Sequence, residues 1–359
     1  MQTSTKIAIG VGVLLLVAAI VLSSRGTAKL ALSPSSSPTL GVTSTTSPTS
    51  ASDLPILQNS MPPFLGIAQW WNTPNNQPLT PESLKGKVVL VDFWTYSCIN
   101  CLRTLPFLKE LQANYASKGL VIVGVHTPEF DFEGVPANVG NAITNLGITW
   151  PVALDNRYQT WNAYQNEYWP AEYLFDAQGR LRHTQFGEGD YDVTEAAIRL
   201  LLADNGATGL GSTTAPIQTP NFSLIETPET YFGLGRGTAF MNAQNPSTNP
   251  TDYVLNAKPT ADQWSAGGSW QFATEYAEAL SDDSTFAFNV QASQLHLVLD
   301  SVDGKDKTIE VSIDGGASQS FTINAPMLYT VAKFPNGGQH TVTIKMINGG
   351  VRFYSATFS

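Results

Sequence analysis

Two cysteines, Cys98 and Cys101, are the only thiols in this chain of 359 residues, and they stand in a C-x-x-C spacing. They lie in the stretch DFWTYSCINCLRTLP, which runs from Asp92 to Pro106. A disulfide that closes so short a loop gains little entropy, so a purely structural crosslink is the weaker interpretation. No second cysteine pair or spaced histidine pair accompanies them, so the sequence offers no zinc-ligand pattern. The pair favours reversible thiol–disulfide exchange.

The position of Cys98, between an apolar strand and a helix, predicts how the two thiols divide this chemistry. Unpaired N–H groups and the positive end of the helix dipole stabilise a thiolate at a helix start, which lowers its pKa. Cys98 is therefore expected to be the attacking sulfur. Cys101 lies one turn further into the helix and is expected to be less exposed, as the resolving thiol.

The elements that position these thiols alternate between strand and helix, which predicts an α/β domain with a partly parallel sheet over residues 61–206. The expected closing helix opens with Asp192 at its cap and ends on Gly206. The other expected elements are a strand at 87–94, a helix at 98–117, a strand at 120–126, a helix and strand within 136–155, a short helix at 157–165 and two strands within 171–187.

The N-terminal residues 1–24 contain an uninterrupted apolar run from Ile7 to Leu22. We expect either a cleaved signal peptide or a membrane anchor, and both alternatives remain open. Either one places the folded chain outside the cytoplasm, membrane-anchored or secreted. Residues 25–60 are rich in Ser, Thr and Pro and are expected to form a solvated linker, with folding beginning near Met61.

A second linker is expected at residues 207–222, and residues 223–359 alternate apolar and polar positions between Gly and Asp turns. This pattern predicts an all-β sandwich of the jelly-roll, carbohydrate-binding-like kind. Four aromatic residues could form a binding platform in it, although core packing is the more common use of such side chains. They are Trp264, Trp270, Phe272 and Tyr276.

The charge of the chain excludes one class of partner. A formal net charge of -10 and a pI near 4.8 argue against nucleic acid, which is bound through clustered Lys and Arg. The four histidines, at positions 126, 183, 296 and 340, are scattered and are expected to be ordinary core or surface residues. The acidic run of Glu129, Asp131 and Glu133 is expected to be a solvated loop.

The stretch VLVDFWTYSCINCLRTLP resembles the active-site strand and helix of the thioredoxin superfamily. Asp92 stands six residues before Cys98, and Pro106 five after Cys101, where the family has a buried acid and a helix proline. Pro170, after Trp169, matches the cis-proline that faces the cysteines. The extra helix and strand are similar to the TlpA-like and redoxin branch. Phrases such as VHTPEFDFEG and ETPETYFGLGR most resemble the thioredoxin-like and C-terminal β portions of DipZ-type proteins.

The resemblance implies a thiol-disulfide oxidoreductase that exchanges disulfides with protein substrates, as a reductant. Its redox group is the Cys98–Cys101 disulfide, with no further cofactor. Asp92 is implied to transfer protons, with a pKa raised by burial, and Pro170 to line the site. DipZ-type proteins carry a membrane module that is absent from this sequence, so electrons are expected from a separate membrane donor of the DsbD/CcdA kind. Ser97 replaces the tryptophan of thioredoxin, which leaves the redox potential open.

Two other functions compete with this one. Thr95 gives a T-x-x-C spacing that resembles peroxiredoxins, which favours a peroxiredoxin-like thiol peroxidase as the enzymatic alternative, although Val91 stands where those proteins have proline. In the second alternative the chain is a cell-surface binding protein whose sandwich holds a glycan or protein ligand.

Overall fold

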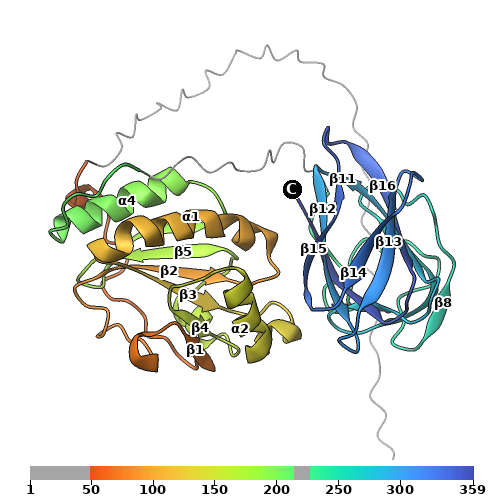
Figure 1. Ribbon diagram of the computed structural model, residues 1–359, viewed down its shortest axis with the longest axis horizontal. Helices are drawn as coiled ribbons and strands as arrows, with labels where there is room; N and C mark the ends of the chain where they lie inside the picture. Colours follow the sequence, from red (N-terminus) through yellow and green to blue (C-terminus); the bar gives the residue numbers. More distant parts are fainter. Residues whose placement is uncertain (1–48, 214–226) are drawn as a thin grey trace, which may run out of the picture. The chain divides into compact units, whose positions relative to one another are not determined.

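The computed structural model describes residues 49–213 and 227–359 (Figure 1). The expected signal peptide or anchor lies outside the described residues, as do most of the first linker and much of the second. Among the residues described, none of the helices combines the length and apolar character needed to span a membrane.

The first domain is built on one mixed sheet, which confirms the predicted α/β architecture. Its strand order is β1-β4-β3-β2-β5-β6. The central strands β2, β3 and β4 run parallel, whereas β5 pairs antiparallel with β2 and β6, and β1 with β4. The strands are β1 (Gln69–Trp71), β2 (Val88–Trp94), β3 (Leu120–His126), β4 (Val152–Leu154), β5 (Ala171–Phe175) and β6 (Leu181–Phe186).

The helices α1 and α4 lie over one face of this sheet (Figure 1). The α-helices are α1 (Ile99–Tyr115), α2 (Pro136–Asn145), α3 (Gln159–Ala163) and α4 (Tyr191–Asp204), and short 3-10 turns occupy Ala51–Asp53, Pro74–Asn76, Ala116–Lys118 and Asp131–Gly134. The predicted cap of the closing helix is wrong. Asp190 is the N-cap, with a left-handed backbone (φ 46°), so Asp192 lies within the first turn.

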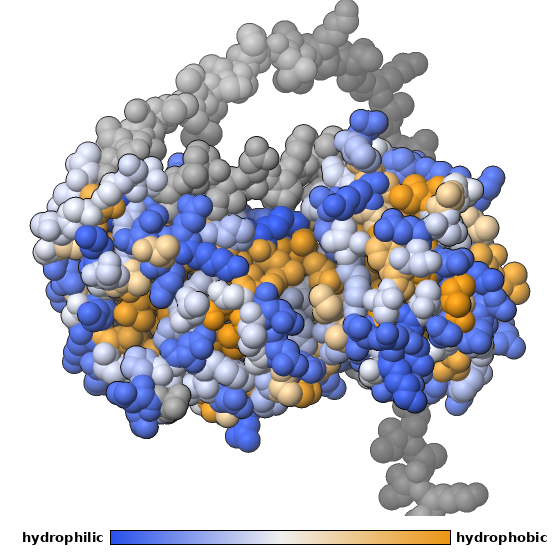
Figure 2. Space-filling model, viewed as in Figure 1, coloured by the Kyte–Doolittle hydropathy of each residue, from blue (hydrophilic) through white to orange (hydrophobic). Residues whose placement is uncertain are grey.

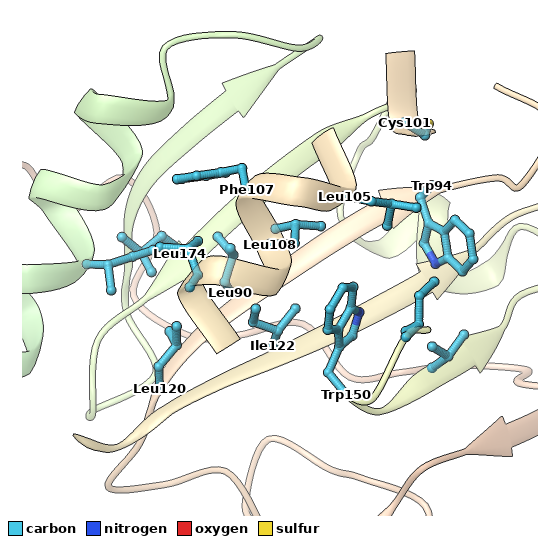
Figure 3. Close-up of a cluster of buried hydrophobic side chains, with 14 of the residues drawn as sticks. Leu90, Trp94, Cys101, Leu105, Phe107, Leu108, Leu120, Ile122, Trp150 and Leu174 are labelled. Atoms are coloured by element: carbon cyan, nitrogen blue, oxygen red, sulfur yellow. The ribbon is translucent and has the colours of Figure 1, made fainter. Parts of the chain in front are cut away.

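Strand β2 divides its side chains between two cores, as its buried position requires. Leu90 and Trp94 face α1 and pack in the same cluster as Cys101 (Figure 3). Val91 and Phe93 face the opposite side, where α3 packs. By this alternation Asp92 points toward α1, between Leu90 and Trp94.

The folded region begins earlier than the sequence suggested. The predicted linker 25–60 is wrong at its C-terminal end, because Gln58 forms a β-bridge with Leu181. The buried Arg182 also donates from Nη2 to the carbonyl oxygen of Leu54 at 2.7 Å. A buried guanidinium needs such acceptors, and this segment supplies them.

The second domain is all-β, and its paired strands run antiparallel, as predicted for the sandwich. The main strand order is β14-β13-β16-β11-β9-β10-β17-β12-β15, with β7 on β17 and β8 on β9. The strands are β7 (Thr230–Tyr231), β8 (Thr251–Tyr253), β9 (Trp264–Phe272), β10 (Ala277–Ala279), β11 (Thr285–Gln291), β12 (Gln294–Ser301), β13 (Lys307–Ile313), β14 (Gln319–Ile323), β15 (Met327–Lys333), β16 (Gln339–Met346) and β17 (Val351–Phe358).

Core packing, which the sequence favoured over a binding platform, is confirmed for three of the four aromatic residues. Trp264, Trp270 and Phe272 are buried and belong to the domain core, whereas Tyr276 is partly exposed. Their rings pack on other aromatic rings, so they are not available to a ligand.

Hydrophilic residues are spread over much of the face seen in Figure 2, with smaller hydrophobic patches between them. Charged residues are mostly exposed in folded domains. Carboxylates that lie beneath α1 depart from this rule and need a specific explanation.

Candidate active site

The N-terminus of α1 places the two cysteines in different environments. Cys98 is the N-cap residue and has an extended backbone, and its Sγ accepts a hydrogen bond from the backbone N–H of Cys101 at 3.4 Å. Cys98 is partly exposed, whereas Cys101 is only 2% exposed. Both are free thiols in this structure. A substrate disulfide can therefore reach Cys98 but not Cys101.

Burial keeps Cys101 protonated. Its pKa is raised well above the ordinary value, first by loss of solvation and then by the hydrogen bond and charge of Cys98 and the charge of Asp92. A thiol is a poor nucleophile, so Cys101 needs a base before it can attack. The neighbouring acid has to meet that need.

Asp92 lies on the α1 side of β2 and is 2% exposed. Its Oδ1 has no hydrogen-bond partner among the described residues. Burial raises its pKa well above the usual value, and the charge of Glu172 raises it further. The structure thus provides a buried carboxyl with a high proton affinity beside Cys101, a suitable proton acceptor for a thiol.

Glu172 is the direct cross-strand neighbour of Asp92 and was missed from the sequence. It lies on β5 and is 3% exposed, and one of its oxygens, Oε2, also lacks a partner among the described residues. Burial raises its pKa to about 7. The only signal in the sequence was a charged residue within the apolar strand AEYLF, and the register that pairs it with Asp92 required the structure.

The peptide bond between Trp169 and Pro170 is cis, as the resemblance implied. Pro170 is buried and directly precedes β5, the strand beside β2. The indole Nε1 of Trp169 donates to the carbonyl oxygen of Thr127 at 3.1 Å, and both Trp169 and Cys98 pack against the core beneath α1. The backbone at Trp169 and Pro170 is therefore held near the end of β2, where α1 begins.

Glu133 corrects the expectation of a solvated acidic loop. It is completely buried, and it accepts hydrogen bonds from Ser97 Oγ at 2.5 Å and from the backbone N–H groups of Glu129 and Phe130 at 2.6 and 3.0 Å. Burial, together with the charge of Glu129, raises its pKa to about 7. Glu133 thereby ties the loop after β3 to the residue that precedes Cys98.

Asn100, between the two cysteines, is held by a charged neighbour. Arg103 donates from Nη2 to Asn100 Oδ1 at 2.5 Å and from Nε to Glu188 Oε2 at 2.8 Å. The guanidinium is thus fixed one turn after the cysteine loop. Its charge lies where it can affect anionic groups that approach the helix start.

Thr95, on which the peroxidase alternative rests, is completely buried, and its Oγ1 lies 3.3 Å from His126 Nε2. His126 is itself completely buried, and burial lowers its pKa to about 3, so the ring is neutral. The hydroxyl is therefore engaged inside the domain. None of these contacts favours peroxide chemistry.

Comparison with known families matches both domains. A family model described as Redoxin matches residues 59–199, and one described as Thioredoxin like C-terminal domain matches residues 227–359.

Individual proteins show the same likeness. Protein DipZ of Mycobacterium bovis is 43% identical over 265 residues, which make up 70% of this chain and 37% of that protein. The chain therefore spans little more than a third of the length of this relative. Thiol-disulfide oxidoreductase YkuV of Bacillus subtilis is 32% identical over 149 residues, or 41% of this chain and 97% of YkuV. Thiol-disulfide oxidoreductase ResA of Bacillus thuringiensis is 28% identical over 118 residues, or 33% of this chain and 65% of ResA.

Proposed function

Because this chain belongs to the thioredoxin-like thiol-disulfide oxidoreductases, we propose that it reduces disulfides of protein substrates outside the cytoplasm through Cys98 and Cys101. One observation carries the proposal. The partly exposed Cys98 caps α1, and the backbone N–H of the buried Cys101 donates a hydrogen bond to Cys98 Sγ. This arrangement separates an attacking thiol from a resolving thiol.

The reaction begins when the Cys98 thiolate attacks one sulfur of the substrate disulfide. The substrate S–S bond breaks, and the sulfur that was not attacked leaves as a thiolate. The attacked sulfur forms a mixed disulfide with Cys98. Asp92 then takes the proton of Cys101, and the new thiolate attacks Cys98 Sγ. The substrate sulfur that was bonded to Cys98 leaves as a thiolate, and a Cys98–Cys101 disulfide forms. Two electrons have then moved from the enzyme to the substrate.

The backbone beside the cysteines completes the site. The cis peptide before Pro170 lies at the start of β5, next to the strand that carries Asp92. Pro170 is positioned to line the surface on which the substrate disulfide rests. Glu133 fixes the loop at Ser97, which keeps Cys98 in register with that surface.

The surroundings of the enzyme follow from its N-terminal sequence and its resemblance to DipZ-type proteins. The apolar run Ile7–Leu22 supports an extracytoplasmic location, either membrane-anchored or secreted. A membrane donor of the DsbD/CcdA kind returns two electrons to the Cys98–Cys101 disulfide after each turnover. A glycan or protein ligand of the β domain is a separate proposal, which the buried aromatic residues do not support.

Insulin reduction tests this function. The reduced protein with excess dithiothreitol should precipitate insulin chains much faster than dithiothreitol alone, and Cys98→Ser should abolish the acceleration. His340→Gln, in the β domain, is the matched control and should leave it intact. A wild-type rate equal to that of dithiothreitol alone would refute the function.

The direction of exchange requires a second measurement. Equilibration with glutathione buffers should show that the Cys98–Cys101 pair has a more negative reduction potential than glutathione. A more oxidising potential would reverse the direction.

A further inference from the structure

Asp92 and Glu172 form a pair of buried carboxyls on adjacent strands. They are opposite each other in the antiparallel register of β2 and β5, so their Cβ atoms are only about 5 Å apart. Each has one oxygen without a hydrogen-bond partner among the described residues. Two acids this close in a dry environment do not ionise together, so the pair retains a proton near neutral pH.

A polar path continues from Glu172 to the edge of the domain. The side chain of Thr194, in the first turn of α4, interacts with the Glu172 carboxyl and lowers its pKa, against the larger effect of burial. Thr194 Oγ1 also lies 3.1 Å from His183 Nε2 on β6. Thr194 is completely buried, whereas His183 is partly exposed. A hydroxyl between a carboxyl and an imidazole can accept a proton from one and donate its own to the other.

We propose that Asp92, Glu172, Thr194 and His183 form a proton route that carries the Cys101 proton from the active site to solvent between β6 and α4. This inference rests on the proposed function, because it concerns the step in which Cys101 attacks. Asp92 is the group that takes the proton. Glu172, Thr194 and His183 act through it and do not touch the reacting sulfurs.

The proton balance of the step explains why a route is needed. When Cys101 becomes part of the disulfide, its proton passes to Asp92, and the acid pair then holds one proton more than before. Glu172 passes a proton to the Thr194 oxygen, and the Thr194 hydroxyl proton moves to Nε2 of His183. The imidazole releases a proton to water, which restores the pair for the next turnover.

Other titratable groups face this route and must be considered in any pH dependence. The charge of Asp92 acts on Cys101 of α1, that of Glu172 acts on Tyr191 of α4, and that of Asp190 acts on His183. Burial lowers the pKa of His183, and the charge of Asp190 opposes that effect. A neutral imidazole at physiological pH is ready to accept a proton from Thr194.

A small aromatic disulfide, dithiobisnitrobenzoate, separates the two chemical steps in the reduced full-length protein. Attack by Cys98 releases one coloured thionitrobenzoate, and attack by Cys101 releases the second. Because thionitrobenzoate leaves as a thiolate, the Cys101 proton must appear in the solvent. A pH indicator in weak buffer follows that proton while the colour follows the sulfur chemistry.

Two variants address the two halves of the route. With Glu172→Gln, the pH profile of the second colour phase should shift to lower pH, because Asp92 loses the charge that raises its pKa. With Thr194→Val, proton release should lag behind the second colour phase by on the order of 100-fold in time, the lower end of the range for one lost proton-transfer group. Thr194→Ser should restore prompt release, and Thr144→Val, which removes a helical hydroxyl on α2, is the matched control.

The outcomes distinguish the route from the function itself. An unchanged pH profile in folded Glu172→Gln, or prompt proton release in folded Thr194→Val, overturns the proposed route. A wild-type protein that releases no second thionitrobenzoate refutes the oxidoreductase function instead. The first colour phase should be unchanged in every variant, which confirms that Cys98 and the fold are intact.

Discussion

At the scale of single residues, the difference in burial gives Cys98 and Cys101 different chemical roles. Cys98 and Cys101 are one helical turn apart, yet one is partly exposed and the other nearly inaccessible. The sequence predicted this difference from the strand and helix around the motif. It did not predict Glu172 or Glu133, because a carboxylate in an apolar strand or in an acidic loop looks like a solvated residue until the register and contacts are known.

Alkylation of the reduced protein near neutral pH should modify Cys98 first. The reason is access, since Cys98 lies at the open end of α1 and Cys101 beneath it. Brief treatment with iodoacetamide followed by peptide mass mapping measures the order. Faster modification of Cys101 would contradict the assigned roles.

Asp92→Asn should slow the attack of Cys101 while leaving the attack of Cys98 nearly unchanged. The amide cannot accept the Cys101 proton, and loss of a general base lowers a rate on the order of 100-fold. The two colour phases with dithiobisnitrobenzoate measure the steps separately. Equal second-phase rates in variant and wild type would reduce Asp92 to a structural role.

At the scale of elements, strand β3 has glycine at a position where a side chain would clash with two buried tryptophan rings. Gly124 is paired in register with Asp92, and an added Cβ would lie 2.9 Å from Trp94 Nε1 and 3.3 Å from Trp150 Nε1. Both tryptophans are about 1% exposed. The strands and helices themselves were predictable from hydrophobic periodicity, but this contact between rings and backbone was not, because it depends on residues far apart in the chain.

Gly124→Ala should destabilise the first domain by about 1 to 3 kcal/mol, because the added methyl group would have to displace two buried indole rings. Urea unfolding followed by tryptophan fluorescence measures this loss. Gly179→Ala is an informative comparison, since an added Cβ there meets nothing within 4 Å, although its φ of 80° carries its own strain. A Gly124→Ala protein as stable as wild type would show that the core can relax.

At the scale of the whole molecule, buried ionisable groups set the dependence of stability on pH. Glu172 and Glu133 have pKa values raised to about 7 from an ordinary 4.5, so the stability from their neutral forms is lost as pH rises through that interval. His126 and His296 have pKa values lowered to about 3 and about 4 from 6.5, so their contribution is lost as pH falls.

These opposite signs predict that the free energy of unfolding is greatest between about pH 4.5 and pH 6.5. Above this interval the buried carboxyls, with Asp92 among them, favour the unfolded chain, and below it the buried histidines do. Urea titrations at a series of pH values measure the profile. A maximum at pH 8 or above would contradict the burial of the acids, and Glu172→Gln should flatten the alkaline side.

The two domains differ in how well their functions could be inferred. The first could be assigned from a short motif, because a C-x-x-C after a strand and before a helix has one dominant chemistry. The β domain has no comparable motif. Its strands followed from alternation, but its prominent aromatic residues proved to be core, so the sequence indicated its fold without its ligand.

The central claim is that Cys98 attacks protein disulfides and Cys101 resolves the intermediate. In Cys101→Ser the first step remains and the second is blocked, so mixed disulfides should accumulate. The exported variant should form adducts that survive non-reducing gels and disappear with reductant. The double variant Cys98→Ser Cys101→Ser should form none. A thiol peroxidase would instead leave a sulfenic acid on Cys98 after peroxide. The absence of adducts from a folded, exported Cys101→Ser protein would contradict this account.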